Sequence, residues 1–143
     1  MKYKLLAVVC VAIALAIVVL QCASRHLGSS DKRGELVLAI RHAQSMLRPL
    51  RNRIEHPQAG DQAFFIRASF TDHNGRKVLL WLKHAEIAPG GFKGVVDEDP
   101  FDLADIHRGD IVTVATDDVV DWTILHADGT HEGGFTQGLE PGS

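Results

Sequence analysis

Cysteine is nearly absent from this sequence. Two of the 143 residues are cysteines, Cys10 and Cys22, and both precede residue 25. The 119 residues that follow Ser24 therefore have no disulfide framework, no thiol nucleophile and no thiolate metal site of their own. A segment of this length can bury the core of one domain without such cross-links.

Motifs of several enzyme classes are missing as well. Ser45 and Ser69 lie in no Gly-x-Ser-x-Gly context, and the sequence has neither an HExxH pair nor a glycine loop before a long helix. Eight histidines are present, but none forms a recognisable ligand pair with a third ligand nearby. The best candidate groups are His84 with Glu86, and His126 with His131 and Glu132. We therefore predict no catalytic residue, no metal site and no cofactor.

Positive charge is scarce in the second half of the chain. Residues 25–93 contain 12 basic and 6 acidic residues, whereas residues 94–143 contain 12 acidic residues and one basic residue, Arg108. The simplest interpretation is that the basic half packs beside the acidic half; the alternative is a dipolar surface that steers a charged partner. Nucleic acid is not expected as a partner, because the body is net acidic and its basic residues are not interleaved with aromatic ones.

The N-terminus has the pattern of an export signal. Two lysines within the first four residues precede the uncharged apolar run 5–20. A short basic region before an apolar run is typical of a secretory signal peptide or a membrane anchor, so we predict one or the other over residues 1–24. Lipidation at Cys22 is a third alternative, although Gln21 stands where a lipobox has a small residue. The protein is thus expected to be exported, either periplasmic or anchored in the inner membrane by this segment.

A helix is expected after a polar tether over residues 25–33. Apolar residues recur every three or four positions from Leu36 to Ile54, which indicates an amphipathic helix. Pro49 should kink or break it near Arg48. The arginines on its other face are either a solvated surface or a phosphate- or lipid-binding stripe.

Alternating apolar residues predict strands in the rest of the chain. Residues 63–70 and 76–85 flank an Asn-Gly turn and form the clearest hairpin. A short strand at 92–96, a brief helix at 101–107, a second hairpin formed by 111–115 and 119–125, and an edge strand within 130–136 should follow. The predicted fold class is α+β: an N-terminal helix packed on a curved, mainly antiparallel sheet of about five strands. Residues 34–138 would form this single domain, with a flexible tail at 139–143.

Asp121 is an unusual residue of the predicted strand 119–125. Alternation places it among apolar neighbours, opposite the face that carries Trp122. A carboxylate in such a place needs hydrogen-bond donors. Either it holds a loop against the sheet, or it is a polar group at the floor of a binding cleft.

An ordered set of short motifs resembles the YegJ-like bacterial family, domain of unknown function 2314. The matching pieces are FFIRASF from Phe64, Trp81-Leu82, Phe92-Lys93-Gly94-Val95, Asp99-Pro100, Gly109-Asp110-Ile111-Val112, Asp121-Trp122 and Gly133-Gly134-Phe135-Thr136. The resemblance implies a compact α+β domain without an established activity. Family members usually have a Glu-His pair just before the tryptophan of the second strand, where this chain has Val78, Leu79 and Leu80.

These observations favour a non-enzymatic binding or accessory module of the cell envelope, with an envelope protein as partner. Aromatic anchors and small residues suggest a binding cleft, which we predict at Trp81, Asp121, Trp122, Gly133, Gly134 and Phe135. Two alternatives remain open: a hydrolase that uses Asp121 with a nearby histidine, and an immunity-like inhibitor that blocks a toxin with its acidic half.

Overall fold

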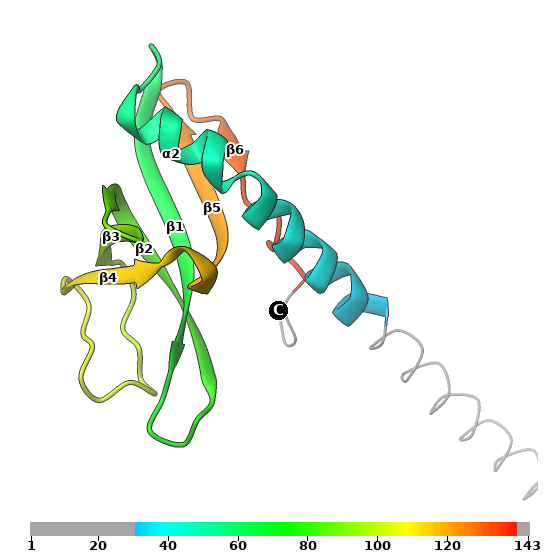
Figure 1. Ribbon diagram of the computed structural model, residues 1–143, viewed down its shortest axis with the longest axis vertical. Helices are drawn as coiled ribbons and strands as arrows, with labels where there is room; N and C mark the ends of the chain where they lie inside the picture. Colours follow the sequence, from blue (N-terminus) through cyan, green and yellow to red (C-terminus); the bar gives the residue numbers. More distant parts are fainter. Residues whose placement is uncertain (1–30, 140–143) are drawn as a thin grey trace, which may run out of the picture.

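The computed structural model describes residues 31–139, which form helices on one side of a single antiparallel sheet (Figure 1). The sheet has six strands in the order β4-β3-β2-β1-β5-β6. Their bounds are Asp61–Thr71 for β1, Lys77–Ala88 for β2, Gly91–Val96 for β3, Ile111–Ala115 for β4, Val119–His126 for β5 and His131–Gly133 for β6. The predicted α+β class is confirmed, with one strand more than expected.

The helical region is divided by a break at Met46. Residues 31–45 are helical, and α2 follows at Leu47–Glu55. Pro49 is the third residue of α2; it has no N–H to donate to the carbonyl of Ser45, and its ring would clash with that carbonyl in a continuous helix. The predicted interruption therefore exists, a little before Arg48. Residues 31–33, which we assigned to the tether, already belong to the helix.

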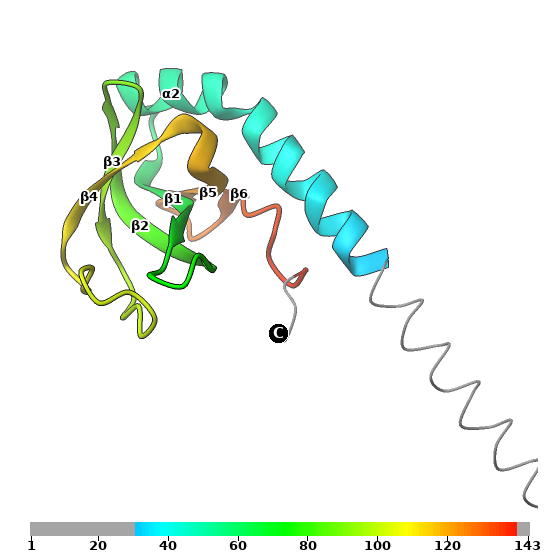
Figure 2. The same cartoon turned by 60° about the horizontal axis from the view of Figure 1, so that its bottom comes forward.

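The core lies between α2 and one face of the sheet. Leu47 and Leu50 of α2 are buried in one apolar cluster with Ile66, Leu82 and Trp122. The sheet curves strongly, and α2 lies across its concave side (Figure 2). A bulge in β2 near His84, where the pairing with β3 shifts and φ is +54°, contributes to that curvature.

The first predicted hairpin is confirmed, since β1 pairs with β2 across the Asp72–Gly75 turn. The second is wrong. β4 pairs with β3, and β5 pairs with β1 and β6, so the two strands lie far apart in one sheet. The segment between them is a 3-10 turn, η1 (Thr116–Asp118), which contacts both β1 and β3 and leads the chain across the curved sheet. The alternating pattern of each segment identified the strands, but pairing with segments distant in the chain decided their partners.

Residues 101–107 form turns and not the predicted helix. Asp97 donates its N–H to Trp81 O, and Gly109 donates to Val96 O, so the loop is held at both ends by the sheet. Between these ends Leu103 donates its N–H to Pro100 O in one isolated turn, and its side chain is buried in the core, so packing of Leu103 shapes the segment. The expected last strand is present as the short β6, after which residues 134–138 turn away.

Candidate functional site

Asp121 is a structural latch for the C-terminal segment. Its side chain is fully buried on β5. Oδ1 accepts hydrogen bonds from the N–H of Trp122 and of Phe135, and Oδ2 accepts them from the N–H and the hydroxyl of Thr136, at 2.7–3.1 Å. Both oxygens are therefore fully used to hold residues 135–136 against β5, and no histidine is among these partners. Of the two interpretations of Asp121, the structure supports the loop-holding one.

Trp122 projects to the other face of β5, where it packs under the first helix. Only 2 % of the residue is exposed, and its Nε1 donates to Ala43 O at 3.1 Å. Phe135 meets the indole edge-on, with ring centroids 5.4 Å apart. Gly133 and Gly134 allow this approach, because both have positive φ and a Cβ at Gly133 would clash with the Trp122 ring and carbonyl. These residues form packing contacts of the core.

Trp81 lies away from this cluster. It sits on β2, and alternation directs its side chain to the face opposite α2, together with Phe65 of β1 and Thr123 of β5. The structure therefore divides the six predicted binding residues. Asp121, Trp122, Gly133, Gly134 and Phe135 come together as a packed anchor. Trp81 shares a sheet face with Asp121, because both pair with Arg67, but it lies two strands away and takes no part in the anchor.

The surface around Trp81 contains a shallow cleft of about 240 Å³, which we call the Trp81 cleft. Its lining residues come from four strands, the loop after β3 and the C-terminal segment: Phe65, Trp81, Asp97, Thr123, Leu125, His131 and Gln137. Aromatic and aliphatic side chains form its floor, with polar groups around them. A mainly apolar concavity with a few polar groups is the usual form of a small-molecule site.

The hydroxyl of Thr123 is the unusual polar group of the cleft. The residue is 7 % exposed, and its Oγ1 is buried without a hydrogen-bond partner among the described residues. Buried polar side chains are normally hydrogen-bonded, since an unsatisfied group costs about 1–3 kcal/mol. Thr123 is the next residue after Asp121 on the same face of β5. A carboxylate that accepts four hydrogen bonds therefore lies beside a hydroxyl that has no hydrogen-bond partner among the described residues.

A half-buried arginine completes this face. The guanidinium of Arg67 lies 5.6 Å from the centre of the Trp81 ring, in cation–π geometry. Burial lowers the pKa of Arg67, while the carboxylates of Glu98 and Asp121 act in the opposite direction. Glu98 also accepts a hydrogen bond from the N–H of Trp81 at 2.9 Å. Asp97, the carboxylate in the lining, is paired with Lys83 at 2.8 Å, so it already has a cationic partner, which suits a ligand without net charge.

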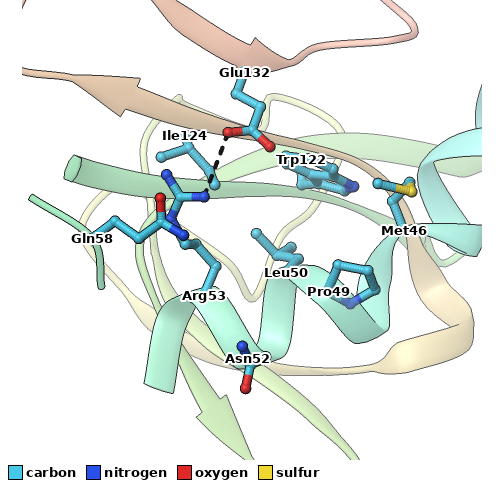
Figure 3. A pocket seen from close by; sticks show the side chains of 9 residues that line it. All are labelled: Met46, Pro49, Leu50, Asn52, Arg53, Gln58, Trp122, Ile124 and Glu132. Carbon is cyan, nitrogen blue, oxygen red and sulfur yellow. Dashed lines mark ion pairs between the residues drawn. The ribbon is translucent and has the colours of Figure 1, made fainter. Parts of the chain in front are cut away.

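A second cavity, of about 230 Å³, lies between α2 and the β5–β6 pair (Figure 3). We call it the α2 cavity; it is lined by Met46, Pro49, Leu50, Asn52, Arg53, Gln58, Trp122, Ile124 and Glu132. Figure 3 shows Glu132 reaching from β6 toward Arg53 of α2, with Nη1 and Oε2 3.9 Å apart.

Arg53 is already engaged beside this cavity. Its Nε and Nη2 donate to the two oxygens of Asp61 at 2.6 and 2.8 Å, which ties α2 to the start of β1. Hydrogen bonds from Arg53, with a smaller contribution from the N–H of Gln58, lower the pKa of Asp61 to about 2 despite its burial. Nδ1 of His126 lies 3.3 Å from Asp61 and its Nε2 lies 3.8 Å from Glu132. This is a stabilising charge network at the edge of the sheet.

The histidine groups considered in the sequence do not assemble into a metal centre. Within residues 31–139 no three His, Cys, Asp or Glu side chains are placed to hold a metal ion. His126 and Glu132 do lie close together, but the carboxylate of Glu132 also pairs with Arg53.

Sequence reasoning missed most of the Trp81 cleft. Phe65, Thr123 and Leu125 share a strand face with Trp81 through cross-strand pairing, and Gln137 joins them from the C-terminal segment. Alternation in FFIRASF and VVDWTIL correctly separates the two faces. The pairing of β1 with β5, which sets the two strands side by side, has no local signal in the sequence.

The predictions for the N-terminal segment, namely the signal or anchor over residues 1–24 and lipidation at Cys22, concern residues outside the described part of the chain. From residue 31 to residue 139, no helix has the length and apolar character needed to cross a membrane.

Comparison with known proteins identifies a family from the sequence. Residues 34–139 match the model of a family described as an uncharacterized protein conserved in bacteria, DUF2314. The chain therefore belongs to this family, as its motifs indicated. One curated relative, the uncharacterized protein YegJ of Escherichia coli strain K12, is 32% identical over 73 residues. The match covers 51% of this chain and 46% of that relative, and thus less than half of its length. No solved structure matched the chain.

Proposed function

We propose that this protein is an exported, non-enzymatic binding module, released into the periplasm or held at the outer face of the inner membrane. The apolar run after Lys2 and Lys4 supports export. Residues 31–139 form one domain on a single sheet, which can act outside the cytoplasm without disulfides because its core is continuous.

The Trp81 cleft is the proposed binding site. The observation that carries this proposal is the buried Thr123 hydroxyl, which has no partner among the described residues and lies in a cleft floored by Phe65 and Trp81. A ring-shaped, uncharged ligand group would cover the apolar floor, and a polar atom on it would satisfy Thr123. In such a site the aromatic rings supply apolar contact area, and the hydrogen bond to the hydroxyl fixes the orientation of the ligand.

Binding explains the geometry better than hydrolysis does. The hydrolase alternative relies on Asp121, whose oxygens accept four hydrogen bonds from residues 122, 135 and 136. A general base needs a free lone pair within reach of a substrate proton. The immunity-like alternative rests on the acidic C-terminal half and remains a second version of a binding function.

Binding at the cleft can be tested by NMR on the full chain in mild detergent, with indole-3-acetamide, benzamide and N-acetylglucosamine as neutral ring probes. We expect shifts at the Trp81 indole N–H and at Thr123. Trp81→Ala should abolish the shift at Thr123, and Thr123→Val should weaken binding about fivefold, the equivalent of one hydrogen bond of about 1 kcal/mol. Ser69→Ala, on the same face of β1 but outside the lining, is the matched control.

Shifts that gather around the α2 cavity, or that survive Trp81→Ala, would contradict the assignment of the site, as would the lack of any shift at millimolar probe. Export is tested separately by the intact mass and the cell fraction of the native protein. Recovery of an unprocessed chain from the cytoplasm would overturn that part.

A further inference from the structure

β4 is an edge strand, and no described residue donates to or accepts from its outer backbone groups. Hydrogen bonds from Val96 N to Asp110 O and from Thr116 N to Gly90 O set the register of its pairing with β3. Because hydrogen-bonded and non-hydrogen-bonded pairs alternate in an antiparallel ladder, Ile111, Thr113 and Ala115 direct their N–H and C=O groups away from β3. No other described strand pairs with β4 (Figure 2).

This edge lacks the usual protection against another strand. The sequence of β4 is IVTVA, which has no lysine, no proline and no charge. Ile111 is 70% exposed, and Phe101 in the preceding loop is 100% exposed. The other edge differs: β6 has three residues, among them His131 and Glu132. Of the two edges, β4 is the one built to accept a further strand.

Negative charge surrounds this edge. The loop before β4, residues 97–110, has six acidic residues and one arginine, Arg108. After β4, Asp117 and Asp118 are exposed on η1 and form no ion pair with a described residue. An extended segment on this edge would therefore have carboxylates near both of its ends. Lysine or arginine on that segment would be attracted, and acidic residues would be repelled.

We propose that the β4 edge binds an extended basic segment of a partner protein by β-strand addition. Main-chain hydrogen bonds to Ile111, Thr113 and Ala115 would supply affinity, and basic side chains facing Asp117 and Asp118 would supply selectivity. Apolar side chains of the segment would cover Ile111. This surface is separate from the Trp81 cleft, so either proposal can fail without the other.

Thr113→Pro is the decisive variant. Proline removes the outward N–H of Thr113, whereas the ladder with β3 uses Val112 and Val114 and stays intact. Thr113→Ala keeps the N–H and serves as the matched control. The probe is a short labelled peptide in which lysine and valine alternate, titrated by fluorescence anisotropy against the full chain in mild detergent. Versions with glutamate for lysine, or with alternate N-methyl groups, test charge and main-chain pairing.

We expect Thr113→Pro to weaken binding of the lysine peptide about tenfold or more, with Thr113→Ala within about twofold of wild type. Neutralising Asp117 and Asp118 together as asparagines should weaken binding several-fold and reduce its salt dependence. The glutamate and N-methyl peptides should not bind. Hydrogen exchange should show new protection at Ile111, Thr113 and Ala115 on binding, in a variant series whose circular dichroism is unchanged.

Three outcomes would overturn this proposal. The first is equal binding of the lysine peptide to Thr113→Pro with β3–β4 exchange protection retained, and the second is no binding at millimolar peptide. The third is self-association of wild type in sedimentation that Thr113→Pro abolishes, because the edge would then be occupied by a second copy of the chain.

Discussion

The two tryptophans show how differently the two faces of this sheet are used. Trp122 faces α2, has 2% of its surface exposed, donates to Ala43 O and packs on Phe135. Trp81 faces away from the helices, stacks with Arg67 and lines a cleft. Both lie on strands of similar alternating pattern. An aromatic residue that a helix covers becomes part of the core, whereas one that no helix covers is available to bind a ligand.

A similar contrast separates two polar residues of β5. Asp121 and Thr123 share the face opposite α2, yet the first accepts four hydrogen bonds and the second has none to a described residue. The C-terminal segment covers β5 at Asp121, and the aspartate holds that segment in place. Thr123, by contrast, lines the Trp81 cleft. Substitutions on the packed side should therefore change stability, and those in the cleft should change binding.

The largest loss of stability is expected for Asp121→Asn. The amide of asparagine keeps one acceptor oxygen. Its NH2 group replaces the other oxygen and would face N–H or O–H donors, to which it cannot hydrogen-bond. Loss of charge-assisted hydrogen bonds in a buried site should lower the free energy of unfolding by about 4 kcal/mol. Urea denaturation of the full chain in mild detergent would measure this.

The conservative partner of this substitution is Thr136→Ser, which keeps the hydroxyl that Oδ2 accepts and should cost much less. If Asp121→Asn unfolds at the wild-type urea concentration, the latch does not contribute as its geometry indicates. The comparison of Asp121 with Thr123 would then lose its basis.

Gly133→Ala should have a somewhat smaller effect, of about 3 kcal/mol. Gly133 has φ of +89°, and an added Cβ would meet the Trp122 carbonyl and approach Cε3 of its ring to 2.8 Å. The cost combines backbone strain with overpacking of the Trp122 side. Thermal unfolding followed by circular dichroism would measure it.

Gly34→Ala is the control for that measurement, since a Cβ at this helical position meets nothing within 4 Å. Alanine there should be neutral or slightly stabilising. Equal melting temperatures for Gly133→Ala and Gly34→Ala would show that the close approach of residue 133 to Trp122 does not matter for the fold.

The smallest effect is a pH dependence on the α2 side. Because the pKa of Asp61 is lowered to about 2 from 3.8, its ion pair with Arg53 stabilises the fold fully above pH 3.8. That contribution declines as pH falls below 3.8 and is lost once pH passes below about 2. Asp61→Asn should therefore lower stability at neutral pH and reduce its fall between these two values.

The matched comparison is Glu132→Gln, because Glu132 is half exposed and lies 3.9 Å from Arg53. Exposed pairs of this kind contribute little, so its pH profile should follow that of wild type. An unaltered acid profile for Asp61→Asn would contradict the role of the Arg53–Asp61 pair.

Strand positions and the helix break were largely predictable, because they depend on local chemistry. Alternation marked β1, β2, β3 and β5, the Asn-Gly pair marked the first hairpin, and Pro49 marked the end of the first helix. The assumption that η1 closes a hairpin was wrong. A few polar residues between two apolar strands are compatible with a tight turn and equally with a connection across a curved sheet.

Side-chain periodicity and turn chemistry were enough to predict most of the elements, the two faces of each strand and the burial of a carboxylate at residue 121, although the helix expected at 101–107 is absent. The tertiary structure alone decided which strands are neighbours, that Asp121 is saturated by residues 122, 135 and 136, and that Trp81 and Trp122 lie on opposite surfaces. These features depend on contacts between residues distant in the chain. They form when α2 and the sheet bury their apolar faces against each other, and no short stretch of sequence indicates which residues will meet.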